Sequence, residues 1–507
     1  MRIRILPLLT AFALIAGACG STVQSSSPKA SGLGADHPAS PDETAGTDGT
    51  SGLEPESRTG GASLSGRSPS GTSGTRSATT GSGASTKVRG VTAKEIYIGI
   101  PYAVNSSAVN ESAGLKGVTR GDEREESSAL IADVNARGGV LGRKIVPVWY
   151  EVDALTNDDA ATMHQAMCEY FTHDHEVFAV FYGGNEQFIK CASDAGLLLV
   201  HDNLAGLSED VFRKYPYYFE ISTPNLDRLL AAQVPALAAQ GYFSPWNTAT
   251  GSPGTARAKV GVVSYDLGPF RRAVEKTLLP ALAKAGYPPQ SGDVIYVYPA
   301  SRQSDLGVTS AQVSSAVLRL ASDGVTHVLI VDLSSAITLF FAQTADSQRY
   351  FPRYGLNSQN GAQVLIDTGI APGQFRGAKG IGFLPILDIR PAENSDDGPY
   401  SNDARRRCVA LMKKYGQEPA DANAKGAMLL SCNQHWLFQE AMRLGGPSIS
   451  RDAFMTGVHR LGSSFQSGVT FRTRFSPSQH EGASGIRHWA FDESCGCMRY
   501  TSDVKDF

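Results

Sequence analysis

The sequence predicts an α/β protein with two doubly wound parallel-sheet lobes. Short apolar runs alternate with helix-length stretches from residue 95 to 200, and the same alternation resumes from residue 225 to 331. Regular alternation favours parallel strands with helices on both faces of each sheet. The stretch after residue 331 is too irregular to form a sheet of its own, so we expect it to complete the lobes through crossing connections.

The first run of alternation predicts four strands and three helices. Strands are expected at residues 95–100, 144–151, 177–182 and 197–200. Helices are expected at residues 123–136, 157–171 and 186–195. Pro101 is expected to end the first strand, and the pair Gly138-Gly139 to end the first helix.

The second run predicts three further strands and three further helices. Strands are expected at residues 259–263, 294–298 and 327–331. Helices are expected at residues 225–239, 269–285 and 309–322. Residues 241–257 form a predicted long loop that enters a strand at its amino end, away from any site at the carboxyl ends. Residues 388–407 are polar and are expected to form a loop at a lobe edge.

The first 18 residues have the layout of a bacterial lipoprotein signal peptide. Two arginines precede an apolar run, and small residues stand directly before Cys19. The apolar run is too short to span a hydrocarbon core of about 30 Å. Ala16 stands where such signals usually carry leucine, and an ordinary cleaved signal with an incidental cysteine is the alternative. We expect a lipid anchor at Cys19 on the extracytoplasmic face of the cell membrane.

Residues 19–87 are predicted to be a lipidated cysteine followed by a disordered tether. Serine, glycine, threonine, alanine and proline dominate this stretch, which has almost no β-branched aliphatic or aromatic residue. Such a composition cannot bury enough apolar surface to offset the entropy of ordering the chain. A Gly/Ser-rich coil of this length has an average reach of about 45 Å.

The charge balance argues against a nucleic-acid partner. The formal net charge is −3 for all 507 residues, and loss of Arg2 and Arg4 with the signal would make it −5. The sequence contains no basic stripe or patch of the kind that neutralises phosphates.

Six cysteines follow Cys19, an even number that suits disulfides in an oxidising compartment. Fifteen pairings are possible, and the simplest joins local pairs. These are Cys168 with Cys191, Cys408 with Cys432, and Cys495 with Cys497. A metal site is the competing use, but Cys495-Gly496-Cys497 has no second ligand motif nearby. We therefore expect no metal and no other cofactor.

Three stretches of the sequence resemble a known family. Residues 88–100 (VRGVTAKEIYIGI) are similar to the start of type I periplasmic substrate-binding proteins of the branched-chain amino acid transporter group. Residues 131–145 carry the Asn-x-x-Gly-Gly-x-x-Gly-Arg pattern that members have between a helix and a strand. Residues 260–266, followed by Phe270, resemble the first strand of the second lobe. Cys168 and Cys191 stand where some members have a disulfide, and the resemblance extends from residue 88 to the end.

The resemblance implies the type I periplasmic binding protein fold, in which two lobes joined by three hinge crossovers close on a ligand. It implies a first lobe from residues 88–223 and 358–470, and a second lobe from residues 224–357 and 471–507. We expect a monomer whose partners are a small-molecule ligand and an ABC permease in the membrane.

Candidate ligand-binding residues are those directly after strands, because loops and helix starts at the carboxyl ends of parallel strands present unpaired N–H groups. Each has a structural alternative, such as a solvated loop, a ligand-free helix start or, for Phe270, an aromatic side chain in the core. In the first lobe the candidates are Tyr102, Gly184, Asn185, Glu186, Asp202 and Asn203, with Asn105 weaker. In the second lobe they are Asp266, Phe270 and Asp332.

Two departures from the family's pattern bear on the ligand. Amino-acid binders of the family use a hydroxyl where this chain has Ala205, and a carboxylate where it has Ala336. That carboxylate pairs with the ligand's ammonium, and Asp332 could replace it only with a different backbone path. Because a buried ammonium without a partner is costly, an amide or a small organic acid suits these positions at least as well as a branched-chain amino acid.

We do not expect an enzyme. The sequence contains no nucleophile elbow, phosphate-binding loop or dinucleotide turn. Two function classes remain. One is a solute-binding lipoprotein for an ABC importer, and the other is a sensing or cell-wall-associated binding module that signals through a membrane partner. A permease encoded beside this chain would favour the first class, and a membrane kinase there the second.

Overall fold

The computed structural model describes residues 88–112, 118–202, 206–300, 303–333 and 335–507. The predicted signal peptide, the Cys19 lipidation site and the tether lie outside these residues, as do Asn203 and Ala205. No helix in the described part is long and apolar enough to cross a membrane.

The first lobe contains a five-stranded sheet in the order β2-β1-β3-β4-β5, in which every neighbouring pair is parallel. Its strands are β1 (Glu95–Val104), β2 (Lys144–Asp153), β3 (Ala179–Val180), β4 (Leu198–His201) and β5 (Tyr218–Glu220). The helices between them are α1 (Ser106–Ser112), α2 (Glu123–Ala136), α3 (Ala160–Glu169), α4 (Glu186–Asp194) and α5 (Glu209–Lys214). Side-chain caps start three of these helices, because Asp122, Asp159 and Asn185 each accept a backbone N–H of the first turn.

β1 continues past Pro101, where the sequence analysis expects it to end. β3 pairs with β1 only at Ile98 and Gly99, while β2 pairs along its whole length. Beyond Gly99 one edge of β1 therefore has no strand partner. Proline is tolerated at such an edge because its missing N–H removes no ladder hydrogen bond.

The second lobe contains the larger sheet, in the order β14-β13-β12-β11-β10-β8-β9, with β15 paired to β13. Its strands are β8 (Val260–Tyr265), β9 (Val294–Val297), β10 (His327–Val331), β11 (Arg353–Asn357), β12 (Lys379–Gly382), β13 (Gly485–Asp492), β14 (Cys497–Tyr500) and β15 (Lys505–Asp506). The five strands from β9 to β12 are parallel, whereas β13 and β14 are antiparallel additions. The helices are α6 (Leu226–Ala239), α7 (Gly268–Ala273), α8 (Leu279–Lys284), α9 (Leu306–Ser322), α10 (Ala336–Ser347) and α11 (Ala362–Asp367).

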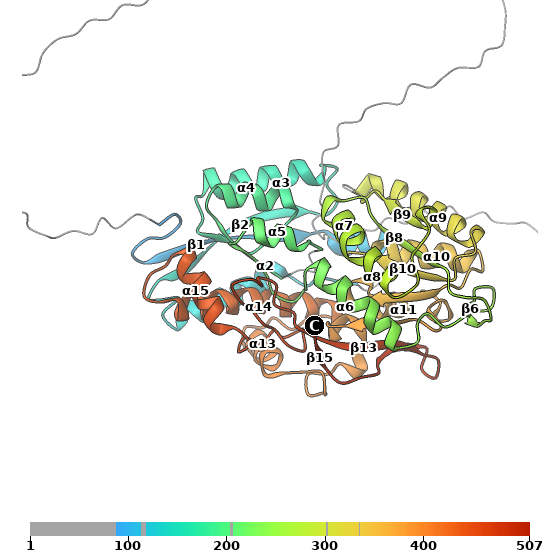
Figure 1. Cartoon of the computed structure of the whole chain (residues 1–507). Coiled ribbons are helices and arrows are strands. Elements are labelled where there is room, and N and C mark those ends of the chain that lie inside the picture. Colours follow the sequence, from blue (N-terminus) through green and yellow to red (C-terminus); the bar gives the residue numbers. More distant parts are fainter. Residues whose placement is uncertain (1–87, 113–117, 203–205, 301–302, 334) are drawn as a thin grey trace, which may run out of the picture. The chain divides into compact units, whose positions relative to one another are not determined.

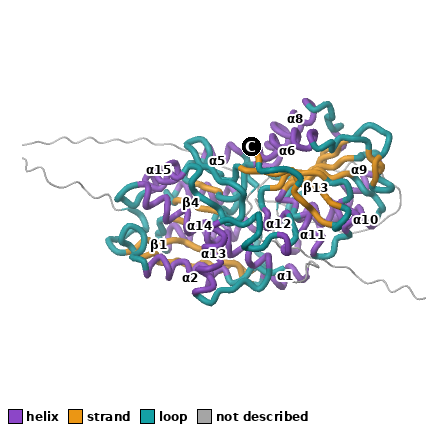
Figure 2. The backbone as a smooth tube through the Cα atoms, turned by 90° about the horizontal axis from the view of Figure 1, so that it is seen from below, coloured by secondary structure: helices purple, strands orange, loops and turns teal. Residues whose placement is uncertain are grey.

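Four helices after β12 return to the first lobe. They are α12 (Pro385–Asp388), α13 (Asp403–Lys414), α14 (Ala422–Gly445) and α15 (Arg451–Leu461). Helices α13 and α14 contact α2, and α14 packs along α15. Figure 1 shows α3 and α4 on one side of β1 and β2, with α13, α14 and α15 on the other. In Figure 2 the strands of the second sheet lie between α6 and α8 on one side and α10 and α11 on the other.

The chain thus crosses between the lobes three times, after β5, after β12 and before β13, which confirms the predicted fold class. The lobe boundaries differ from those that the resemblance implies. β11 and β12 both belong to the second sheet, so the second lobe runs to residue 382 rather than 357. The resemblance also assigns residues 471–483 to the second lobe, but they contact the first. The Phe475 ring packs on Phe219 of β5, and Thr473 forms an isolated β-bridge with Ala483 before the chain enters β13.

Three expected segments have more structure than the sequence indicates. The predicted helix over 269–285 is α7, a π-helical turn at Val274–Leu278 and α8, and the turn stands just before Pro280, which cannot donate an α-helical hydrogen bond. Residues 241–257 contain a short hairpin of β6 (Trp246–Asn247) and β7 (Ser252–Pro253). The expected loop over 388–407 begins at a fully buried aspartate and ends inside α13.

Three disulfides form with the local pairing. Cys168–Cys191 joins α3 to α4, and Cys408–Cys432 joins α13 to α14. Cys495–Cys497 closes the turn between β13 and β14. The first two bonds each cross-link neighbouring helices on one face of the first sheet.

Candidate functional site

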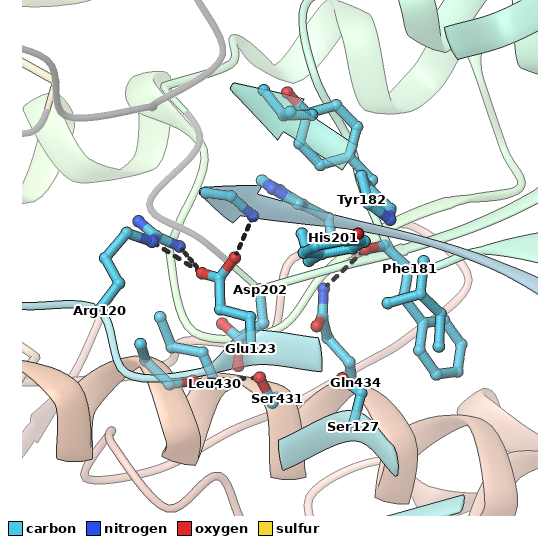
Figure 3. A pocket seen from close by; sticks show the side chains of 16 residues that line it. Arg120, Glu123, Ser127, Phe181, Tyr182, His201, Asp202, Leu430, Ser431 and Gln434 are labelled. Carbon is cyan, nitrogen blue, oxygen red and sulfur yellow. Dashed lines mark hydrogen bonds and ion pairs between the residues drawn. The ribbon is translucent and has the colours of Figure 1, made fainter. Parts of the chain in front are cut away.

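A pocket lies in the first lobe at the carboxyl ends of β1, β3 and β4 (Figure 3), and we call it the first-lobe pocket. It holds about 70 Å³, and the total with the space that opens to solvent is about 670 Å³. Helices α2 and α14 close it from below. Its lining residues are Ile100, Pro101, Tyr102, Ala103, Arg120, Glu123, Ser127, Val152, Phe181, Tyr182, His201, Asp202, Ala427, Leu430, Ser431 and Gln434.

An ion pair at the start of α2 supplies the charge of one wall. Arg120 Nη2 lies 2.5 Å from Glu123 Oε1, and the Arg120 side chain is one-fifth exposed. Glu123 Oε2 also accepts the backbone N–H of Ala103 at 2.9 Å. The Glu123 carboxylate is thus held by the backbone of Ala103, and its ion pair in turn holds the Arg120 side chain at the pocket wall. Its guanidinium has five N–H donors in a planar fork, so it retains donors for an oxyanion.

Another part of the wall is a buried polar network that begins at the end of β4. His201 Nδ1 lies 2.6 Å from Glu220 Oε2. Asp202 accepts the N–H and hydroxyl of Ser222, each at 3.0 Å, and the side-chain amide of Asn433 at 2.7 Å. Burial, with a smaller contribution from nearby Glu220, raises the pKa of Asp202 well above its usual range. Burial therefore favours the neutral form of the Asp202 carboxyl group, while the hydrogen bonds from Ser222 and Asn433 oppose this rise in pKa.

Helix α14 supplies the floor. Gln434 Nε2 donates to the carbonyl oxygens of Phe181 at 3.4 Å and of Val200 at 3.3 Å, which ties α14 to the ends of β3 and β4. Ser431 and Leu430 complete the floor (Figure 3). Ser431, Leu430 and Gln434 follow no strand, so they are not among the predicted ligand-binding residues. The available signal was a pair of polar residues, Ser431 and Gln434, at helical spacing in an otherwise largely apolar stretch.

The predicted residues of the first lobe are only partly brought together. Tyr102 lines the pocket and donates its hydroxyl to Glu151 at 2.9 Å, and Asp202 lines it as described. Asn185 is the N-cap of α4, and its side chain accepts the Phe188 N–H at 2.8 Å. Gly184 precedes it with a φ of 57°, which glycine adopts without strain. Glu186 lies outside the pocket lining and pairs with Lys214 and Arg272.

None of the three second-lobe candidates lines this pocket. Asp266 forms an ion pair with Arg271. Phe270 is fully buried, its ring 5.4 Å from that of Tyr265, so it packs in the core. Asp332 is also buried and binds the start of α10, where it accepts the N–H of Leu333, Ile337 and Thr338 and the Thr338 hydroxyl.

The second lobe contacts the first lobe through α7. Arg272 of α7 lies 2.9 Å from Asp210 of α5 and 3.6 Å from Glu186 of α4. The Phe270 ring packs against the backbone of Gly206, where a Cβ would come within 2.5 Å of it. This contact joins α7 to Gly206 of the first lobe. Among the described residues, no cluster of histidine, cysteine and acidic side chains could hold a metal ion.

Comparisons with known proteins agree with this geometry. No protein-family model matches the chain, and no curated protein matches it. Solved structures do. A possible leucine/isoleucine/valine-binding protein from Rhodopirellula baltica has a TM-score of 0.54 at 14% identity, over 82% of this chain and 98% of that one.

Two further structures have the same architecture. An ABC-transporter solute-binding protein from R. palustris in complex with 4-hydroxybenzoate has a TM-score of 0.56 at 11% identity, over 82% of this chain and 97% of that one. A type 1 periplasmic binding protein from Bordetella pertussis has a TM-score of 0.54 at 15% identity, over 81% of this chain and 100% of that one. At these identities the likeness establishes the fold, which is that of type I periplasmic binding proteins.

Proposed function

We propose that this protein is an extracytoplasmic solute-binding lipoprotein. It captures a small polar metabolite between its two lobes, with the first-lobe pocket as the first lobe's part of the site, and delivers it to an ABC importer. The observation that carries this proposal is the position of the pocket. It lies where the carboxyl ends of parallel strands present loops and helix starts to a ligand, in a fold shared with solute-binding proteins. The lipid anchor at Cys19 remains part of the proposal.

The second-lobe positions at which the family's amino-acid binders hold the ligand's ammonium favour an amide or a small organic acid over a free amino acid. Arg120 and the backbone groups at the strand ends suit a carboxylate or carbonyl oxygen. An amino acid also needs an acceptor for its ammonium, but Ala336 starts α10 and Asp332 is occupied by the same helix. Because a buried ammonium without a partner is costly, these two positions oppose amino-acid binding.

Thermal unfolding of the whole protein against a panel of ligands tests the proposal. The panel contains 4-hydroxybenzoate and other small organic acids, aliphatic amides and urea, and the branched-chain amino acids. The protein is first unfolded and refolded to remove any carried-over ligand. A ligand at 100 times its Kd should stabilise the folded state by about 2.7 kcal/mol, which is a clear shift in Tm.

Two variants show whether such a shift comes from this pocket. R120Q removes the pocket's guanidinium, and R319Q removes an exposed guanidinium on α9 whose carboxylate partner, Asp323, directly follows the same helix. Binding of an organic acid should weaken in R120Q and stay unchanged in R319Q. A shift that survives R120Q intact would place the ligand elsewhere, and the absence of any shift would count against a small-molecule function.

A further inference from the structure

A second cavity lies on the C-terminal side of the chain and is larger than the first-lobe pocket. It is lined by residues of the segment 463–474 with Asn402, Ser484, Asp506 and Phe507, and we call it the C-terminal cavity. Its volume is about 310 Å³, against about 70 Å³ for the first-lobe pocket. Pockets that bind small molecules usually measure about 300–1,000 Å³. The C-terminal cavity therefore has room for a ligand.

The charged side chains of this cavity favour an anion. Arg472 forms an ion pair with Asp506 at 2.6 Å. Arg474 also lines the cavity, and no carboxylate of the described residues lies within ion-pair distance of its guanidinium. The Arg474 guanidinium is thus a cationic group of the cavity wall that none of the ion pairs among the described residues uses. A guanidinium recognises carboxylate and phosphate groups through paired N–H donors.

The rest of the lining suits the uncharged part of an organic ligand better than it suits an inorganic ion. The aromatic rings of Phe471 and Phe507 provide apolar surface, and the side chains of Thr470 and Ser484 provide hydroxyls. Thr470 and Ser484 are largely buried, at 5% and 8% exposure, so these hydroxyls are fixed in the wall. The combination matches a small anion with an aromatic or apolar body.

Ser467 connects this cavity to the first-lobe pocket. It lines the cavity, and its hydroxyl lies 2.9 Å from Asn433 Nδ2 and 2.9 Å from the Ser222 hydroxyl. Asn433 and Ser222 are the same two residues that hold Asp202 in the wall of the first-lobe pocket. All four side chains are buried. Ser222 follows β5 on the first crossing between the lobes, so the network also includes a hinge segment.

We infer that the C-terminal cavity is a second ligand site, for a small organic anion with an aromatic or apolar body, and that Ser467 links it to the first-lobe pocket. A ligand in the cavity contacts the wall that contains Ser467 and so favours one arrangement of the Ser467–Asn433–Ser222 network. Because Asp202 depends on that network, occupancy of either site changes the affinity of the other by the same factor.

Calorimetric titration of the whole protein with benzoate and with phenyl phosphate tests the site. The two probes share an aromatic ring and distinguish a carboxylate from a phosphate source. We expect saturable binding of at least one probe, in a phase that is weakened tenfold or more in R474Q and unchanged in R319Q. This phase should remain in R120Q, which removes only binding at the first-lobe pocket. Arg474 is exposed, so R474Q should fold, and its circular dichroism spectrum verifies this.

Three results would overturn the site. The first is equal affinity of the probe for R474Q and the wild type. The second is loss of all binding in R120Q, which would assign the probe to the first-lobe pocket. The third is the absence of saturable binding of either probe. Because R120Q and R474Q affect different cavities, failure of this inference is distinguishable from failure of the proposed function.

The link rests on the proposed function and needs a ligand of the first-lobe pocket. The Kd of that ligand is measured with and without saturating probe. Allosteric coupling between two sites is typically about 5- to 150-fold. In the wild type we expect the probe to change this Kd at least about fivefold. The change should be lost in S467A. It should be retained in S484A, which alters the same cavity outside the hydrogen-bond network. An unchanged Kd in the wild type, or coupling that survives in S467A, would overturn the link.

Discussion

The Asp332 carboxylate shows how local structure can remove a charged residue from ligand binding. Its two oxygens accept three backbone N–H groups and one hydroxyl at the start of α10. Burial raises the pKa of Asp332 to about 6, and these hydrogen bonds oppose that rise. The residue stands directly after a strand, as a ligand-binding residue would, but its acceptors are already in use.

We predict that D332N lowers stability and leaves ligand affinity unchanged. The new amide nitrogen would face N–H groups that now donate to an oxygen, and an unsatisfied buried polar group costs about 1–3 kcal/mol. Urea unfolding should show a loss of this size, while D323N, an exposed change on the same lobe, should show almost none. Weaker ligand binding at unchanged stability would return Asp332 to the site.

Some residues of the site can be predicted from the sequence, and others cannot, because their place depends on packing. Tyr102 and Asp202 follow strands directly, and the rule that ligands bind at the carboxyl ends of strands identifies them. Arg120 lies in a loop before α2, and Gln434 lies 232 positions after Asp202 (434 − 202). Their approach to the pocket depends on how helices pack on the sheet, which local patterns do not encode.

At the scale of elements, one side chain of α7 joins two helices of the other lobe. Arg272 contacts Asp210 of α5, Glu186 of α4 and the Ser208 hydroxyl. These side chains are 32–43% exposed, so each ion pair is worth only about 0.2–1 kcal/mol. The pairs nevertheless act on the arrangement of the lobes, because they form only when α7 approaches α4 and α5.

We predict that R272Q favours separation of the two lobes. Loss of about 1 kcal/mol of contact should weaken ligand affinity severalfold, since 1.4 kcal/mol corresponds to a factor of ten. Small-angle scattering should show a larger radius of gyration than for the wild type or R319Q. High salt should reproduce part of the effect in the wild type, because it screens partly exposed ion pairs. An unchanged radius and affinity would show that these ion pairs do not hold the lobes together.

The helix-to-helix disulfides give a second prediction at this scale. Cys408 and Cys432 are separated by 24 residues, and closing a loop of this length stabilises a folded protein by about 3 kcal/mol in the chain-entropy model. The variant C408A/C432A should lose stability of this order in urea unfolding. The matched variant C495A/C497A, with a separation of only 2, should lose roughly half as much. Equal losses would mean that loop closure is not the source of the stabilisation.

At the scale of the whole molecule, a buried acid lies where the chain crosses between the lobes for the second time. Asp388 ends α12, and its Oδ2 accepts the hydroxyls of Tyr500 at 2.6 Å and of Ser358 at 2.9 Å, and the N–H of Leu384 at 3.1 Å. Burial raises the pKa of Asp388 to about 7. The carboxyl group therefore connects strand β14, the end of β11 and the crossing segment.

We predict that D388N reduces the pH dependence of stability between about pH 4 and pH 7. The folded pKa is about 7 and the unfolded value is 3.8, so the folded state binds more protons and its stability falls as the pH rises through this window. Each pKa unit is worth roughly 1.4 kcal/mol. The asparagine oxygen can keep the same donors, so D388N should lack this part of the decline.

Urea unfolding at several pH values measures the difference between wild type and variant. D323N is the control for a carboxylate on the protein surface. Parallel curves for wild type and D388N would show that Asp388 is ionised throughout the window.

The sequence by itself determined the alternation of strands and helices and therefore the two parallel sheets, because the period of apolar residues is a local property. It also determined several element bounds, such as α2 at residues 123–136, where Asp122 caps the start and Gly138-Gly139 ends the helix. Tertiary structure alone decided that β12 joins the second sheet and that α14 forms the floor of the first-lobe pocket. Both depend on contacts between segments far apart in the chain, and only packing brings such segments together.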